Sequence, residues 1–279
     1  MPSEKRARQR AAREARQAAE AQAAKRRKQI RNGIIVVIAA GAIVGIAFLV
    51  SSGNNPVGNQ SKTSTTLSSA SGTNAQLQAK ANAAAVKAGC PSSPTAPANN
   101  QHYTAAPAMT IDTTKSYSAT VVTTTGTFDI GLNAKAAPQT VNNFVFLAKK
   151  GFFHCNAFFR VIPGFVNQTG NPAQTNASSG TSGASYTLPS ENLPPAGSAG
   201  KPAYPNGSVA MATSSAGVSG SQFFIVAGAQ GESLPSSYPL FGLVTSGMNV
   251  VDTINKQGST SGIPPAVTQR ILSITIHES

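Results

Sequence analysis

The sequence predicts a mainly β domain carried behind a single transmembrane helix, and three features of the 279-residue chain lead to this prediction. Short β-branched and aromatic runs, separated by turn residues, recur after residue 116. An uncharged apolar run lies near the N-terminus, and a stretch of small and polar residues separates the two. We therefore expect a cytoplasmic basic helical segment at 1–32, a signal-anchor helix at 33–51, a flexible linker at 52–115 and the folded domain at 116–279.

The basic residues are concentrated at the N-terminus rather than spread over the domain. Residues 1–31 hold 11 of the 22 Lys and Arg residues and three of the nine acidic ones, so this block carries +8 of the net charge of +13. The remainder carries only +5, so we expect no specific nucleic-acid partner for the domain. The composition of the block is that of a solvated or lipid-surface helix, with RNA binding as the weaker alternative.

The apolar run from Ile34 to Val50 contains 17 residues without a charge. At about 1.5 Å per residue it extends roughly 26 Å, near the lower limit for crossing the bilayer core, whereas a buried core helix would usually show a polar stripe. The sequence KRRKQIR at 25–31 precedes the run and few basic residues follow it, so the N-terminus should be cytoplasmic and the domain extracytoplasmic. The long basic region and the lack of an A-x-A site favour an uncleaved single-pass anchor in the cell membrane over a cleaved signal peptide.

The linker is dominated by Ser, Thr, Asn, Ala, Gln, Gly and Pro from Ser51 to about Thr110. Such a composition buries too little apolar surface to offset chain entropy, which predicts a flexible spacer. A short helix at 76–88, closed by Gly89, is the one regular element that we expect in it.

The domain itself reads as short strands with two helices. Pro138 opens a helix whose apolar residues follow helical spacing as far as Gly151, and a second helix fits 248–257. Seven strand-like runs, two helices and long loops predict a barrel or sandwich with helical plugs. The strand-like runs are 117–125, 127–132, 158–162, 208–212, 222–227, 240–245 and 268–276.

Two cysteines and three histidines are too few ligands for a zinc ribbon or a haem attachment site, and we expect neither metal nor cofactor. Cys90 and Cys155 both fall on the predicted outer side of the membrane, where an oxidising compartment favours disulfides. Their spacing leaves two alternatives open, one disulfide or two unrelated thiols.

Two apolar strings each enclose isolated polar residues. FFRVIPGFVNQ at 158–168 places one Arg and one Gln among apolar residues, and GSQFFIV at 220–226 places a second Gln inside a strand. Strand alternation puts Gln222 and Phe224 on one face. Spacing alone favours a satisfied core amide for Gln222 over a residue of a pocket.

These strings resemble those of the cyclophilins, the peptidyl-prolyl cis–trans isomerases. FFRVIPGFVNQTG, GSVAMA, GSQFFIV and LFGLV are similar to family strings in the same order, and APQTVNNF and YTLPSEN are similar to two others. The resemblance covers about 116–279. It implies a closed eight-stranded antiparallel β-barrel capped by two α-helices, with proline-containing polypeptides as partners. The sequence leaves the oligomeric state open, and an oligomer is not predicted.

The resemblance also implies the site. Arg160 takes the position of the catalytic arginine, whose guanidinium would donate a hydrogen bond to the prolyl nitrogen of a twisted X–Pro bond. The residues implied in catalysis are Arg160, Phe165, Gln168 and Gln222. The residues implied in substrate binding are Val166, Met211, Ala212, Thr213, Phe224, Leu234 and Tyr238.

Three departures from the family pattern set the alternatives. Phe159 stands where the family usually has His, Val166 is smaller than the usual Met, and Ser233 falls near the position of a Trp that contacts cyclosporin. The first hypothesis is an isomerase that acts on exported or surface proteins. The second is a module that binds proline-containing segments with weak or no isomerase activity, and a purely structural envelope protein ranks last.

Overall fold

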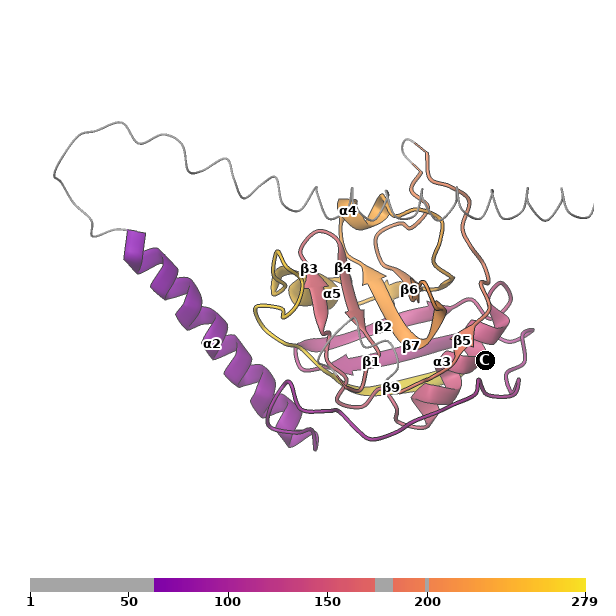
Figure 1. Ribbon diagram of the computed structural model, residues 1–279, viewed down its shortest axis with the longest axis horizontal. Coiled ribbons are helices and arrows are strands. Elements are labelled where there is room, and N and C mark those ends of the chain that lie inside the picture. Colours follow the sequence, from indigo (N-terminus) through magenta and orange to yellow (C-terminus); the bar gives the residue numbers. More distant parts are fainter. Residues whose placement is uncertain (1–62, 174–182, 199–200) are drawn as a thin grey trace, which may run out of the picture. The chain divides into compact units, whose positions relative to one another are not determined.

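The computed structural model describes residues 63–173, 183–198 and 201–279, with side chains from Thr73 onward. These residues belong to a compact unit that spans Ser61–Ser279 (Figure 1). The predicted basic segment at 1–32 and the predicted transmembrane helix at 33–51 lie outside the described residues. Among the helices that are described, none combines the length and the apolar character needed to cross a bilayer.

The described part of the chain forms one antiparallel sheet of nine strands, which confirms the mainly β prediction. Eight of the strands follow one another in the order β3-β4-β7-β6-β8-β2-β1-β9, and the short β5 pairs with β7 beside this path. The strands are β1 (Tyr117–Thr123), β2 (Gly126–Leu132), β3 (Arg160–Ile162), β4 (Val166–Thr169), β5 (Thr187–Leu188), β6 (Ser208–Ser214), β7 (Gly217–Val226), β8 (Leu240–Ser246) and β9 (Ile271–Glu278).

The sheet differs from the predicted closed eight-stranded barrel in its additional short strand β5 and in being open between its two end strands, β3 and β9. Just before these strands, the chain is joined by a single β-bridge between Ala157 and Arg270. We call the unpaired region between β3 and β9 the seam. The outer side of β3 is already occupied, since Val161 N donates to Gly262 O at 2.9 Å and Ser259 N donates to Val161 O at 3.1 Å. The loop after the last helix therefore takes the place that β9 would have in a closed barrel.

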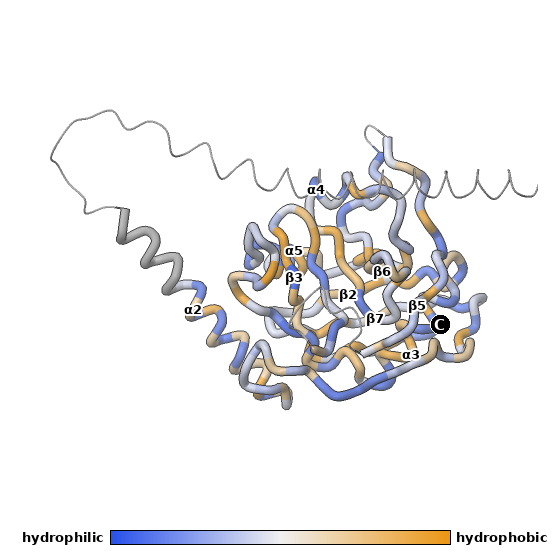
Figure 2. The backbone as a smooth tube through the Cα atoms, viewed as in Figure 1, coloured by the Kyte–Doolittle hydropathy of each residue, from blue (hydrophilic) through white to orange (hydrophobic). Residues whose placement is uncertain are grey.

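The two predicted helices are present as α3 (Pro138–Lys149) and α5 (Met248–Lys256). Helix α3 packs against β7 and β9, whereas α5 packs against β2, β3 and β4. Phe144 of α3 lies in the main core between the rings of Phe153, Phe223 and Phe241, at centroid distances of 5.3–5.6 Å. Figure 2 shows hydrophobic residues along the strands and mostly polar residues in the surrounding loops. A one-turn helix, α4 (Ala229–Glu232), was not predicted.

The linker predicted at 52–115 is described from Thr63 on, and from Gln78 on it makes defined contacts with the domain where a flexible spacer was expected. Helix α2 (Thr63–Lys87) extends well beyond the predicted 76–88 helix. Ala81 and Ala85 are buried, and Thr268 N donates to Gln78 Oε1 at 2.7 Å. We call residues 73–115 the strap. The composition did not predict these contacts, because it indicates only how much apolar surface a segment can bury. The strap also exchanges hydrogen bonds with backbone groups of the domain, which the composition does not reveal.

The strap continues along the domain after α2. Asn99 Nδ2 donates to Phe152 O at 2.9 Å, and Tyr103 forms a parallel bridge with Ala184. Near the end of the strap, Thr110 N donates to Asn142 Oδ1 of α3 at 2.8 Å. The strap therefore contacts the domain from α3 to the residues that precede β9.

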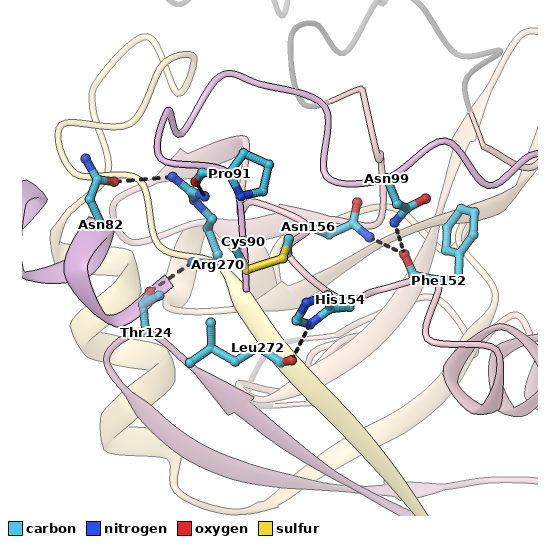
Figure 3. The surroundings of a disulfide bond; sticks show 11 residues. Asn82, Cys90, Pro91, Asn99, Thr124, Phe152, His154, Asn156, Arg270 and Leu272 are labelled. Atoms are coloured by element: carbon cyan, nitrogen blue, oxygen red, sulfur yellow. Dashed lines mark hydrogen bonds between the residues drawn. A yellow bond between two sulfur atoms is a disulfide. The ribbon is translucent and has the colours of Figure 1, made fainter. Parts of the chain in front are cut away.

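A disulfide and a buried arginine fasten the strap at the seam (Figure 3). Cys90 and Cys155 are bonded, which selects the first of the two alternatives left open by their spacing. Arg270 is fully buried, and its guanidinium donates to Pro91 O at 2.6 Å and to Asn82 Oδ1 at 3.3 Å. Both acceptors belong to the strap, so the strap supplies partners that this buried cation would otherwise lack.

We expect the disulfide to stabilise the full chain measurably. Replacing Cys90 and Cys155 by Ser should lower the free energy of unfolding by about 2–5 kcal/mol, because the unfolded chain regains the freedom of a long loop. Urea denaturation followed by circular dichroism measures this change. The oxidised wild type is the reference, and the reduced wild type should match the double variant. Equal midpoints for all three samples would show that the strap is held without its covalent bond.

Candidate active site

The hairpin of β3 and β4 places an arginine opposite a glutamine. Arg160 and Gln168 are register partners, so their side chains lie on the same face. Arg160 Nη1 donates to Gln168 Oε1 at 3.1 Å. The hairpin can turn this tightly because Gly164 has φ +74°, a conformation that disfavours residues with a Cβ atom.

A second amide continues this polar chain on the neighbouring strand. Gln168 Nε2 donates to Gln222 Oε1 of β7 at 3.1 Å, and both glutamines are buried. In the part of the chain that the structure describes, Arg160 forms no ion pair. Burial lowers the pKa of the Arg160 guanidinium, although this group stays protonated at neutral pH. The cation is therefore held in place by a neutral amide.

The guanidinium lies at a cavity of about 160 Å³. Its Cζ atom is 5.6 Å from the centre of the Phe165 ring, a cation–π arrangement. The rings of Phe224 and Tyr238 meet edge to face at 5.3 Å on another wall. The lining residues are Arg160, Phe165, Val166, Gln168, Ala212, Thr213, Phe224, Leu234 and Tyr238.

An adjoining groove of about 130 Å³ shares Gln168, Ala212 and Thr213 with this cavity. Gln222 lines the groove rather than the cavity itself. Tyr186 forms part of its wall and donates to Asn143 Oδ1 at 2.5 Å. Burial raises the pKa of Tyr186 to about 12, so its hydroxyl remains a donor at neutral pH. Cavity and groove adjoin through these shared residues, and both are lined by polar and apolar side chains.

The structure brings together every residue implied by the resemblance except Met211. The side chain of Met211 lies in the main hydrophobic core and not at the cavity. Along β6 the side chains alternate between faces, and Ala212 faces the cavity while Met211 faces inward. The Met211 side chain, which we expected to line the groove, therefore lies in the core instead.

A buried tyrosine that the sequence analysis missed supports one wall of the cavity. Tyr204 is fully buried, and its hydroxyl accepts from Tyr238 N and donates to Tyr238 O, both at 2.9 Å. It therefore fixes the backbone that presents the Tyr238 ring. Tyr204 lies in a loop rich in Pro, Gly and Ser, where no periodic pattern could have identified it.

One group of side chains is arranged closely enough to suggest a metal among the described residues. It consists of Cys90, His154 and Cys155. The two sulfur atoms form the disulfide and are not available as thiolates, and His154 Nδ1 is 2.7 Å from Leu272 O. The residues of this group do not fit a metal in the oxidised protein.

The model of the family "Cyclophilin type peptidyl-prolyl cis-trans isomerase/CLD" matches residues 118–276, more than half of the chain. The chain belongs to the cyclophilin-type peptidyl-prolyl cis-trans isomerases. The predicted family and enzyme class are thereby confirmed.

Curated relatives of this cyclophilin carry the same activity in their names. Peptidyl-prolyl cis-trans isomerase B of Bacillus subtilis is 42% identical over 118 residues, which cover 42% of this chain and 75% of that protein. The Helicobacter pylori enzyme is 39% identical over 142 residues, covering 50% of this chain and 80% of its own. A probable isomerase B of Mycobacterium leprae is 34% identical over 172 residues, covering 57% of this chain and 56% of its own.

Among solved structures, a cyclophilin-type isomerase of Cryptosporidium parvum matches with a TM-score of 0.46 and 22% identity. The match covers 59% of this chain and 99% of that one.

We expect the amide of Gln168 to be required for full isomerase activity. Gln168→Leu removes the acceptor of Arg160 Nη1 while keeping similar bulk, so kcat/KM should fall about tenfold as the guanidinium loses its fixed direction. A protease-coupled assay with an Ala-Pro peptide measures this loss. Gln139→Leu, at an exposed position of α3, is the matched control and should leave kcat/KM unchanged. Equal losses in both variants would contradict the role of the amide.

Proposed function

We propose that this cyclophilin accelerates X–Pro rotation by a hydrogen bond from Arg160 to the prolyl nitrogen. Rotation of an X–Pro bond meets a barrier of about 20 kcal/mol, because the planar amide is conjugated. In the twisted transition state the prolyl nitrogen regains a lone pair that the planar forms lack. A donor aimed at this nitrogen therefore binds the transition state more strongly than either ground state.

The observation that carries this proposal is the setting of Arg160. Its guanidinium lies at an apolar cavity and is held by the neutral Gln168, with no ion pair in the described part of the chain. A carboxylate partner would neutralise the charge on which the donor strength depends. A neutral partner fixes the direction of the guanidinium and leaves its remaining N–H groups free for substrate.

The apolar walls give the proline ring a defined seat. Val166, Phe224 and Leu234 come from β4, from β7 and from the loop after α4, and they line the same cavity. A proline ring held by these contacts keeps its position while the carbonyl group of the preceding residue rotates about the X–Pro bond. The mechanism needs no nucleophile, proton-transfer base or cofactor, so every step rests on side chains of this chain.

The proposed substrates are exported or surface proteins, and the proposed location is the outer side of the cell membrane. The apolar run at 34–50 and its basic flank support an anchor with the domain extracytoplasmic. The Cys90–Cys155 disulfide supports an oxidising compartment, because structural disulfides are rare in the cytosol. Proline-containing segments that emerge unfolded at the membrane would then be its clients.

A binding module with weak isomerase activity is the second candidate, and Ser233 favours it. Its hydroxyl donates to Ala229 O at 3.2 Å and so bonds to its own helix, and Ser233 does not line the cavity. Substrate is consequently less enclosed on this side than a large aromatic residue would make it.

We expect Arg160→Ala to lower kcat/KM by about 100-fold, the usual scale for losing one transition-state donor. The assay uses the full chain in mild detergent with an Ala-Pro peptide and protease coupling. Arg160→Lys keeps the charge but loses the fork geometry and should recover only part of the activity. Equal rates for wild type and Arg160→Ala would reject the mechanism.

NMR exchange spectroscopy on the same samples separates the two candidates. An isomerase produces cis–trans exchange cross-peaks in the peptide, and Arg160→Ala should bind the peptide while losing these peaks. A wild type that shifts the peptide resonances without exchange peaks would establish the binding module instead.

A further inference from the structure

We propose that Asn255 of α5 is a positioning residue that sets the direction of the Arg160 guanidinium through the turn between β3 and β4. This inference rests on the function proposed for Arg160. Asn255 does not line the cavity. It acts on the turn Pro163–Phe165, which joins the strand of Arg160 to the strand of Gln168.

The oxygen and both N–H groups of the Asn255 side-chain amide are used on this turn or beside it. Gly164 N donates to Asn255 Oδ1 at 2.7 Å, so the oxygen holds the middle of the turn. Asn255 Nδ2 donates to Ile162 O at 3.0 Å, at the end of β3. The same nitrogen donates to Asn167 Oδ1 of β4 at 2.8 Å. One side chain thus links both strands and the turn.

The partner amide extends this link back to the helix. Asn167 is fully buried, and its Nδ2 donates to Val251 O of α5 at 2.9 Å. Asn255 is itself only 6% exposed. Asn255 therefore donates to the Asn167 oxygen while the Asn167 nitrogen donates to the backbone of α5, and together they hold the hairpin to the helix at two levels.

The turn is held on its other side by backbone groups alone. Gln230 N donates to Gly164 O at 3.1 Å, and Ala227 N donates to Phe165 O at 2.9 Å. These bonds restrain the carbonyl groups of the turn, whereas the N–H of Gly164 depends on Asn255. Losing Asn255 would leave the turn fixed on one side only.

The direction of the guanidinium depends on this turn through Phe165. Phe165 is the last residue of the turn, and its ring centre lies 5.6 Å from Arg160 Cζ. A shift of the turn moves the ring and the start of β4, and hence both contacts that hold Arg160. Val166, Phe224 and Leu234 would still seat the proline ring, since two of these three come from elements that Asn255 does not contact.

The test compares Asn255→Leu and Asn255→Asp with a control on the same helix. Leu keeps the volume and removes all three hydrogen bonds, and Asp keeps the acceptor for Gly164 N. Asn249→Ala, at an exposed position of α5, is the control. Full-chain variants are assayed by NMR exchange, which gives turnover and peptide affinity separately.

We expect Asn255→Leu to lower kcat about tenfold with KM within about twofold of wild type, because orientation and not proline binding is lost. Asn255→Asp should lose less, and Asn249→Ala nothing. The proton resonances of the Arg160 side chain should lose the ring-current shift that Phe165 causes, and across the variants this loss should be larger where kcat falls further. In the Phe165→Leu background, Asn255→Leu should cost clearly less than in wild type, as expected for residues that act together.

Two results would overturn the inference. Variants that melt earlier while turnover per folded molecule and the Arg160 resonances stay as in wild type would make Asn255 purely structural. If Asn255→Leu fails to fold, the same readouts on Asn255→Asp decide the question. Failure of the proposed function is distinguishable, since it appears as unchanged turnover in Arg160→Ala, whatever Asn255 does to the resonances.

Discussion

The site depends on holding a cation still without neutralising it. Arg160 is bonded through Nη1 to Gln168, and Gln168 is bonded in turn to Gln222. The three residues come from β3, β4 and β7, which are consecutive in the sheet, so strand pairing sets their separation. A neutral amide chain costs less on burial than a chain of charges and passes no countercharge to the guanidinium. Among the residues that line the cavity, Arg160 is consequently the one that carries a charge.

The same sheet presents the residues of the site on one face and the hydrophobic core that supports them on the other. One face of β6 presents Ala212 to the cavity, and the other places Met211 in the main core. Behind the cavity, Tyr204 holds the backbone of Tyr238 and Asn255 holds the turn at Gly164. Two walls of the cavity, at Tyr238 and at Phe165, are therefore supported by side chains that do not line it. This arrangement keeps the residues that line the cavity in fixed positions.

Much of the fold was predictable because local signals agreed with the final structure. Short β-branched and aromatic runs identified β1, β2 and β8, and Pro138 with Gly151 delimited α3. The site residues were predictable from ordered family strings, since those strings lie on strands that pair with one another. The remaining features depend on contacts distant in the chain. Asn255 and Tyr204 carry no pattern of their own, and their roles arise only when α5 and a loop reach the cavity.

The strap and the seam could not be predicted for a related reason. The composition of 73–115 is that of an unfolded segment, and what orders it is a disulfide to Cys155 and the acceptors it offers to Arg270. The sheet is open at the seam because the loop after α5 occupies the backbone groups of Val161, with which β9 would otherwise pair. Both features depend on contacts between segments that are far apart in the sequence, which no short window of sequence contains.

The seam gives the domain an uneven resistance to local opening. Arg160 lies on the end strand of the sheet, where one neighbouring strand and a loop hold it instead of two strands. End strands are where fraying of a native sheet begins, at a free energy below that of global unfolding. Cys155 stands five residues before Arg160 and is covalently tied to the strap, so the chain entering this strand cannot peel away far. Local opening is therefore expected to stop short of Cys155 and to stay within the few residues around Arg160.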